Sequence, residues 1–314
     1  MQAVFDIILP VFGLIALGYF AARTGWVKDS AADGLARVVF DVAMPALLFR
    51  TMIEVEAPDA SPWGLWAAYF GGCVAAWALM ALLAWKALRR PADEVAVAGL
   101  AAAYSNTMML GLPLILKAYG DLGAVPLFLI ISVHMPVMLF AGTLHIEAVR
   151  GTSRSPLLLA REVVSSLARQ PIVIGLLAGL VYRQTGLGLH PVPSQIVQTL
   201  GSSAIPLALL AMGLTLKRYG ITGDLPVAAG VIAVKLVVHP LVVWWLAGAV
   251  FGLPPVWVGV ATLFAASPPG INAYLFAVRY DVGVGAASSA IAIGTVLSAL
   301  TMAAILVALG LQVG

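Results

Sequence analysis

The stretch Ala101–Gly120 reads AAAYSNTMMLGLPLILKAYG, and the stretch Leu263–Tyr280 reads LFAASPPGINAYLFAVRY. Each belongs to an apolar run long enough to cross a bilayer, yet each carries residues that interrupt helices. These are Gly111 and Pro113 in the first stretch, and Pro268, Pro269 and Gly270 in the second. Because a proline removes a backbone donor and clashes with the preceding turn, both runs predict broken membrane helices.

The composition around these stretches indicates a membrane protein. Of 314 residues, 62% are hydrophobic and only 10% are charged, and the mean hydropathy is +1.03. A soluble domain carries roughly 25% charged residues, so a soluble protein is excluded. The sequence predicts about ten spans, at roughly 4–22, 33–51, 63–87, 95–117, 122–147, 170–183, 195–216, 226–251, 256–278 and 284–310.

The basic residues favour one orientation in the membrane. If the N-terminus lies outside, thirteen Lys and Arg residues fall on the inner side and three on the outer side. The positive-inside rule therefore places both termini outside, since the number of spans is even. The first apolar run is not a cleavable signal, because its basic residues, Arg23 and Lys28, follow it.

The chain divides into two halves, 1–148 and 170–314, joined by a linker over 149–169. A shift of 161 residues superposes Pro10 on Pro171, Gly18 on Gly179 and Pro45 on Pro206. Each half holds an odd number of predicted spans, so the second half is expected to be inverted relative to the first. The linker has apolar and basic positions at roughly helical spacing, which predicts a cytoplasmic interfacial helix. A regulatory role for it is the alternative.

The two breaks fall in register. Under the same shift, 106–113 coincides with 267–274, which is 106 + 161 and 113 + 161. Paired interruptions in inverted halves point to a substrate site, and helix N-termini there favour an anion. We expect Asn106, Ser267 and the backbone donors around Pro268–Gly270 to hold it. The alternative is a pair of ordinary proline kinks.

At these two segments the sequence resembles the auxin efflux carrier family, which contains plant PIN carriers and bacterial malonate-type carriers. SNTMMLGLPLILKAYG resembles the family's Asn-Thr followed by Gly-x-Pro, and SPPGINAYLFAVRYDV resembles its Pro-x-Gly-Ile. The matching positions are Asn106, Thr107, Gly111, Pro113, Pro268, Pro269 and Gly270. Pro269 and Ala273 depart from the plant pattern, which puts an auxin-like substrate in doubt.

The resemblance implies an all-α fold of ten helices with a 5+5 inverted repeat and two crossing broken helices, spans 4 and 9. This plan is similar to that of the sodium–proton antiporter NhaA and of bile-acid symporters. The resemblance also implies a scaffold of spans 1, 2, 6 and 7, an elevator-like transport domain of spans 3–5 and 8–10, and a homodimer in the bacterial inner membrane.

A few further polar residues lie within the predicted spans, where ionisable groups are expensive. Lys235 and His239 lie four apart, hence on one helix face. They are candidates for charge compensation or proton coupling. The alternative is a structural role, in which Lys235 pairs with a carboxylate and His239 forms a hydrogen bond with a neighbouring helix. Asp41 is expected to pair with Lys235, to bind a proton or to form a static ion pair. Asn272 is a candidate to complete the substrate site with Asn106.

Three classes of function remain, of which a carrier of a small mono- or dicarboxylate, malonate- or auxin-like, is favoured. A sodium- or proton-coupled carrier is the alternative, although 104–113 and 266–274 contain no aspartate. An intramembrane enzyme is disfavoured, because the motifs G-x-S-x-G and H-E-x-x-H and the P-loop are absent. We expect no cofactor, no metal and no nucleic-acid partner. The single cysteine, Cys73, excludes a disulfide within one chain.

Overall fold

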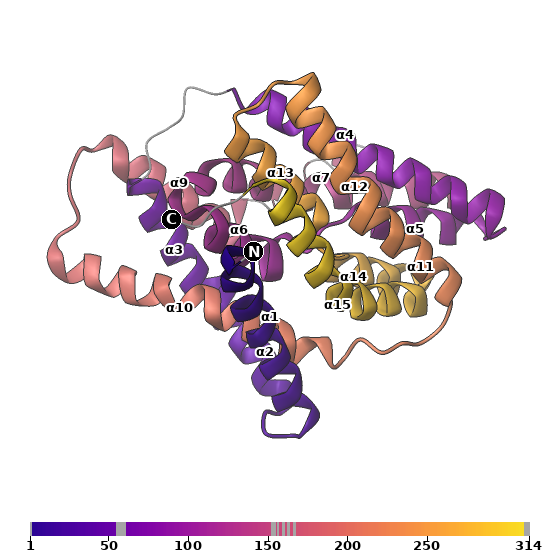
Figure 1. Ribbon diagram of the computed structural model, residues 1–314, viewed down its shortest axis with the longest axis horizontal. Helices are drawn as coiled ribbons and strands as arrows, with labels where there is room; N and C mark the ends of the chain where they lie inside the picture. The colour runs from indigo at the N-terminus through magenta and orange to yellow at the C-terminus, as the bar shows by residue number, and fades with distance from the viewer. Residues whose placement is uncertain are drawn as a thin grey trace.

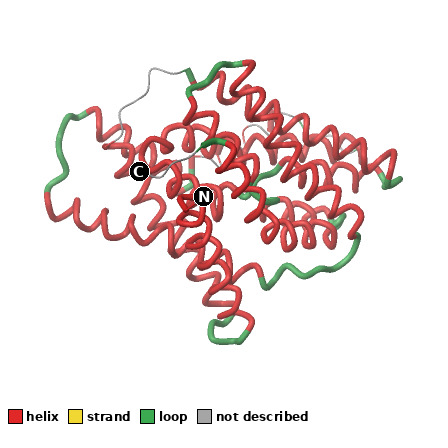
Figure 2. Tube along the Cα trace, in the orientation of Figure 1, coloured by secondary structure: helices red, strands yellow, loops and turns green. Residues whose placement is uncertain are grey.

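The chain is helical in the computed structural model, which describes residues 2–54, 61–151, 155, 157–158, 161, 164–165 and 168–310. Figures 1 and 2 show helices joined by short loops, with no strand among the described residues. The predicted all-α fold is therefore confirmed. The predicted interfacial helix over 149–169 lies for the most part outside the described residues.

Six helical runs are long and apolar enough to cross a membrane, among the residues that the structure describes. They are Val4–Arg23, Pro62–Ala87, Thr107–Arg150, Pro191–Leu216, Leu225–Val250 and Val284–Ala308. Pro171–Gln184 and Pro255–Ala266 are shorter apolar helices. The protein is thus a multi-pass membrane protein, while the count of ten spans and the inverted repeat stay predictions.

One group of helices packs closely around α10 and α3. It consists of α1 (Gln2–Arg23), α2 (Asp29–Val38), the π-turn η1 (Val39–Ala43), α3 (Met44–Glu54), α9 (Pro171–Gln184) and α10 (Pro191–Leu216). Small residues allow these backbones to approach, as is usual between membrane helices. A Cβ added to Gly175 of α9, for example, would lie 2.7 Å from the Cα of Pro45 in α3.

A second group contains the remaining helices. In the first half these are α4 (Pro62–Leu82), η2 (Leu83–Ala87), α5 (Ala92–Ala103), η3 (Thr107–Gly111), α6 (Leu112–Tyr119), η4 (Gly120–Gly123) and α7 (Ala124–Arg150). In the second half they are α11 (Leu225–Ala233), η5 (Val234–Val238), α12 (His239–Trp245), η6 (Leu246–Val250), α13 (Pro255–Ala266), α14 (Ile271–Tyr280) and α15 (Val284–Ala308). In Figure 1, α4, α5, α11 and α12 lie on the opposite side of the molecule from α3, α9 and α10.

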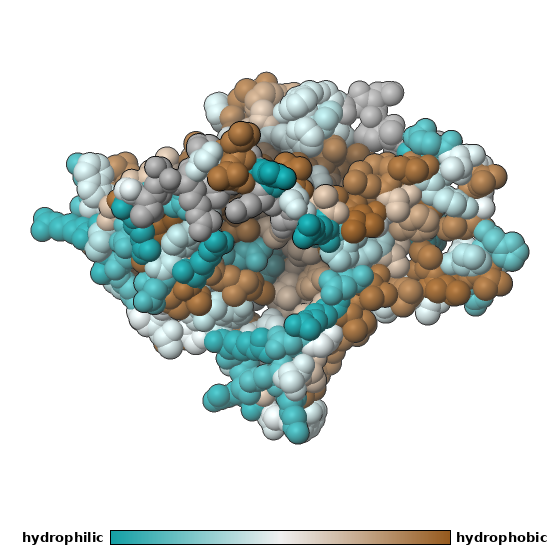
Figure 3. All heavy atoms as spheres, turned by 180° about the vertical axis from the view of Figure 1, so that it is seen from behind, coloured by the Kyte–Doolittle hydropathy of each residue, from teal (hydrophilic) through white to brown (hydrophobic). Residues whose placement is uncertain are grey.

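The surface is apolar over much of its extent. Figure 3 shows brown, hydrophobic atoms across the molecule, with hydrophilic atoms gathered on the lower protrusion and along the left margin. The lower protrusion is the end where α1 turns into α2. Large side chains such as Leu9, Trp63 and Val74 are exposed on the helices. An exposed apolar surface of this extent is expected to face lipid rather than water.

Ion pairs lie at the helix ends and stay within each group. In the first group, Arg218 Nη1 lies 2.7 Å from Asp33 Oδ1, joining α10 to α2. In the second, Arg150 of α7 lies 3.5 Å from Asp93 of α5. Leaving aside the interactions of Glu147 and Arg183, no ion pair between described residues joins one group to the other.

Candidate functional site

The first broken helix is interrupted at 104–106. α5 ends at Ala103, Tyr104 is extended (φ −78°, ψ 112°), and the helix resumes at Thr107. Asn106 caps the new helix, since its Oδ1 accepts a hydrogen bond from the Met109 amide at 3.3 Å. The predicted position of the break, at Gly111 and Pro113, is wrong. Both residues are helical, and Pro113 is the second residue of α6, one residue beyond a π-turn in which the regular hydrogen bonding is already altered.

The second broken helix is interrupted at the predicted prolines. α13 ends at Ala266, Ser267 is extended (φ −60°, ψ 143°), and α14 begins at Ile271 after Gly270. Pro268 and Pro269 fill the break, where no intrahelical donor is required of them.

The two breaks pair with each other through their backbones. The Asn106 amide donates to the Pro268 carbonyl at 2.9 Å, and the Gly270 amide donates to the Tyr104 carbonyl at 2.9 Å. Ser105 and Pro269 thus face each other in an antiparallel bridge. Their separation is 164 residues (269 − 105), three more than the shift that relates the two halves. Non-helical backbone is tolerated at membrane depth only when it is satisfied in this way.

Two glycines permit this close approach. A Cβ on Gly270 would lie 2.7 Å from Cδ1 of Tyr104, and a Cβ on Gly111 would lie 2.7 Å from Cδ1 of Phe264 in α13. Gly111 therefore acts in packing η3 against α13, and not in breaking the helix as predicted. The absence of a side chain at both glycines lets the two broken helices pack closely where they cross.

A cavity of about 180 Å³ lies on one side of this crossing. The starts of η3 and α14 both border it, together with side chains from η1 and α7 and the residue before α9. The first amides of a helix have no intrahelical acceptor and carry partial positive charge. The lining residues are Phe40, Tyr104, Ser105, Asn106, Thr107, Met108, Met109, Ile131, Met135, Gln170, Gly270, Ile271 and Asn272.

Four of the residues predicted for the substrate site line this cavity: Asn106, Thr107, Gly270 and Asn272. Asn106 is 6% exposed, and its Nδ2 has only a long contact, 3.9 Å, with Met212 Sδ of α10. Gly111, Pro113, Pro268 and Pro269, which were also predicted for the site, do not line the cavity. Ser267, which was expected to contact the anion, does not line this cavity, and its hydroxyl donates to the Leu263 carbonyl at 3.2 Å.

Sequence reasoning missed the aromatic wall of the cavity. Tyr104 accepts a hydrogen bond from Asn272 Nδ2 at 2.7 Å, which joins the two breaks by side chains as well as by backbone. Its position directly before Ser105 and Asn106 is the only signal in the sequence. Phe40 and Gln170 come from distant parts of the chain, and nothing in the local sequence distinguishes them.

The opposite side of the crossing is filled by Lys235, which is fully buried in η5. Its Nζ contacts Ser105 Oγ at 2.6 Å, the Ala265 carbonyl at 2.7 Å and His239 Nδ1 at 2.9 Å. Ala265 is in the last turn of α13, and Ser105 follows the end of α5. Lys235 therefore lies at the C-terminal ends of α5 and α13, the half-helices that precede the two breaks. A cation is stabilised at such helix ends.

A buried polar network continues from Lys235. His239 Nε2 lies 3.5 Å from Cys73 Sγ, while the Tyr69 hydroxyl donates to Ser105 Oγ at 3.1 Å and lies 3.3 Å from His134 Nδ1. The predicted neighbours Lys235 and His239 are thus brought together. Neither Lys235 nor His239 lines the cavity, so neither side chain is placed to contact an anion bound there.

The expected pairing of Asp41 with Lys235 is wrong. Asp41 lies in η1 of the first group and is exposed, whereas Lys235 is enclosed by the second group. No ion pair of Asp41 with another described residue is present. The half-helix ends, and not a carboxylate, surround the lysine.

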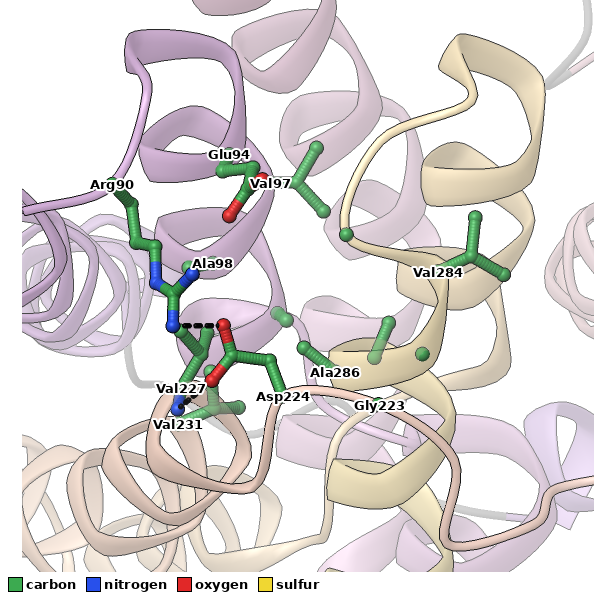
Figure 4. A pocket seen from close by; sticks show the side chains of 14 residues that line it. Arg90, Glu94, Val97, Ala98, Gly223, Asp224, Val227, Val231, Val284 and Ala286 are labelled. Atoms are coloured by element: carbon green, nitrogen blue, oxygen red, sulfur yellow. Dashed lines mark hydrogen bonds and ion pairs between the residues drawn. The ribbon is translucent and has the colours of Figure 1, made fainter. Parts of the chain in front are cut away.

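A second pocket, of about 240 Å³, lies between the start of α5, the start of α11 and the start of α15. Figure 4 shows Asp224 of this pocket facing the guanidinium of Arg90, with which it forms an ion pair. The Asp224 carboxylate also accepts from the Val227 amide at 3.3 Å, capping α11. Arg90 is thus already neutralised by Asp224, and this ion pair joins the loop before α5 to the start of α11.

A multi-pass membrane protein that encloses a small cavity between two interrupted, crossing helices has the build of a transporter. The chain belongs to the family of membrane transport proteins (Mem_trans), which matches residues 3–306. This is the auxin efflux carrier family that the sequence resembles. Membership identifies the protein as a membrane transporter and not an enzyme.

Curated relatives extend over nearly the whole chain. It is 28% identical over 308 residues to a protein of Rhizobium meliloti called "Putative malonate transporter", covering 98% of this chain and 96% of that one. It is 26% identical over 302 residues to an "Uncharacterized transporter" of Methanothermobacter thermautotrophicus, covering 95% of each chain. A further "Uncharacterized transporter", from Methanocaldococcus jannaschii, is 24% identical over 306 residues, covering 95% of this chain and 96% of that one.

Proposed function

We propose that the chain is a secondary transporter of a small organic anion, which binds in the cavity at the crossing. The observation that carries this proposal is that two helices, η3–α6 and α14, begin at one cavity within the membrane-spanning bundle. The Thr107 and Met109 amides already have protein acceptors, so the donors left for a carboxylate are the remaining first-turn amides and Asn106 Nδ2, with the partial positive charge of both helix N-termini. No Asp or Glu lines the cavity to oppose it.

The proposed mechanism is alternating access of the elevator type. The group of helices around α10 acts as the scaffold, and the second group, which carries the crossing, slides against it. This proposal is supported by the ion pairs, which stiffen each group internally. Between the groups, the long contact of Asn106 Nδ2 with Met212 Sδ is weak, so a sliding motion would break little there.

The proposed architecture in the membrane follows the predicted one. It has ten spans as a 5+5 inverted repeat, with spans 1, 2, 6 and 7 as scaffold, and a homodimer in a bacterial inner membrane with both termini outside. Malonate is the first candidate substrate, because the name of the Rhizobium meliloti relative refers to it. A sodium-coupled carrier is less well supported, since the crossing segments 104–113 and 266–274 contain no aspartate.

Uptake by reconstituted vesicles tests the proposal. Purified protein in liposomes should accumulate radiolabelled malonate or another small carboxylate above the level of protein-free liposomes. Asn106→Ala should reduce uptake to that level, because the variant removes a donor in the cavity and the cap of η3. Gln184→Ala, at the exposed end of α9, is the matched control and should transport normally. Normal uptake by Asn106→Ala would remove the site assignment.

A further inference from the structure

We infer that the crossing is balanced for a single negative charge, so that the transported species is a monocarboxylate or a dicarboxylate that has kept one proton. This inference rests on the proposed function and names the charge state of its substrate. It comes from counting the charges on the two sides of the crossing.

The cavity side carries the positive ends of two helices. Thr107, Met108 and Met109 form the first turn of η3, and Ile271 and Asn272 begin α14. Each helix N-terminus is equivalent to roughly half a positive elementary charge. Together the two ends offer about one positive charge to the cavity. No cationic or anionic side chain lines the cavity to change that sum.

The opposite side carries the negative ends of the other two half-helices. α5 ends at Ala103 and α13 at Ala266, and each C-terminus is equivalent to roughly half a negative charge. The ammonium of Lys235 lies between them and supplies one positive charge. Its three donors are all engaged, by Ser105 Oγ, the Ala265 carbonyl and His239 Nδ1. This side is therefore filled and balanced by a residue of the protein itself.

The groups around Lys235 add no compensating anion. α4 presents Tyr69 and Cys73, α5 presents Tyr104, α7 presents His134, and α12 presents His239. α13 presents only the Ala265 carbonyl, and α11 and α15 contain no titratable residue. Lys235 is thus held at the helix C-termini and offsets their charge, so the two helix N-termini leave a net of about one positive charge at the crossing.

One negative charge in the cavity completes the balance, and a second would be unpaired. Uncompensated charge within the membrane is strongly disfavoured. Malonate should therefore bind as its hydrogen-malonate form, and its fully ionised form should bind poorly. A monoester of malonate has nearly the same shape and only one ionisable group, so it isolates the effect of charge.

The test compares the binding of malonate and monomethyl malonate to detergent-purified protein between pH 6 and pH 8. We expect the dissociation constant of monomethyl malonate to stay nearly constant, since its charge does not change. That of malonate should rise about tenfold per pH unit well above its second ionisation, in step with the loss of the singly ionised form. Dimethyl malonate, which is neutral, should not bind.

Each other outcome has a distinct meaning. Malonate that binds as tightly at pH 8 as at pH 6, and more tightly than its monoester, would overturn the single-charge inference and leave the anion carrier intact. Binding of dimethyl malonate as tightly as the monoester would overturn both the inference and the anion site. A malonate affinity that falls with pH in parallel with that of the monoester would place the titration in the protein and would also overturn the inference.

Discussion

The two sides of the crossing are built from the same backbone device with opposite polarity. On one side, two half-helices end around a fully buried lysine that fills the space between them. On the other, two half-helices begin around a cavity of about 180 Å³. A helix end in the membrane thus requires a countercharge, supplied either by the protein or by a ligand. In a transporter the countercharge supplied by the protein stays in place, while the one supplied by the ligand binds and leaves.

The filled side gives the largest expected effect. Lys235→Met should abolish uptake, because it leaves the Ala265 carbonyl and Ser105 without their cationic partner and two helix ends without a countercharge. Each buried polar group left unsatisfied costs about 1–3 kcal/mol, so the free energy of unfolding should fall as well. Liposome uptake and thermal unfolding in detergent measure both. Lys217→Met, at the end of α10, is the control. Wild-type uptake by Lys235→Met would show that the two helix C-termini need no countercharge for transport.

The open side is tested by changing charge without changing shape. Asn106→Asp keeps the capping oxygen of η3 but brings a carboxylate to the cavity, so carboxylate binding should be lost while the melting temperature stays close to wild type. Asn106→Ser keeps a capping oxygen but shortens the side chain and so withdraws the amide donor from the cavity. One hydrogen bond to a charged group is worth about 1.5–3 kcal/mol, so its affinity should fall at least tenfold. Equal binding by Asn106→Asp and wild type would place the anion elsewhere.

A smaller effect is expected where the two breaks are joined by side chains. Tyr104→Phe removes the acceptor of the Asn272 amide but keeps the ring in the cavity wall. A neutral hydrogen bond contributes about 0.5–1.5 kcal/mol, so affinity should weaken by about twofold to tenfold as Asn272 loses its orientation. Titration calorimetry with the transported acid measures this. Tyr182→Phe, whose hydroxyl contacts the Gly188 carbonyl in an exposed loop, should bind as wild type does.

The smallest effect should come from Asp41. It is exposed on the first group of helices and pairs neither with Lys235 nor with another described residue. Asp41→Asn should therefore leave the dissociation constant of the anion within a factor of about two. A tenfold or greater loss of affinity would mean that Asp41 also contributes to the electrostatics of anion binding.

The sequence predicted the all-α membrane fold and the second break, because composition and adjacent prolines act locally. It misplaced the first break. Gly111 and Pro113 look like helix breakers, but tertiary packing against Phe264 and a π-turn keep them helical. The break occurs instead at Tyr104–Asn106, where the backbone of the other broken helix supplies partners.

The site was predicted in part for the same reason. Asn106, Thr107, Gly270 and Asn272 lie beside the breaks, so a local signal was enough to find them. Ser267 was expected in the site, yet its hydroxyl turns to its own helix. The position of Lys235 depends on how α5, α12 and α13 meet in space, and sequence spacing identified only its neighbour His239.

Substrate protection of a cysteine in the cavity decides whether the anion binds at the crossing. Met108→Cys places a thiol in the cavity lining, while the native Cys73 is buried. In vesicles with confirmed uptake, saturating malonate should slow maleimide labelling of Met108→Cys at least fivefold. Labelling of Leu122→Cys, 76% exposed and outside the cavity, should not change. If malonate is transported but labelling at position 108 proceeds at the same rate with and without it, the anion does not bind at the crossing.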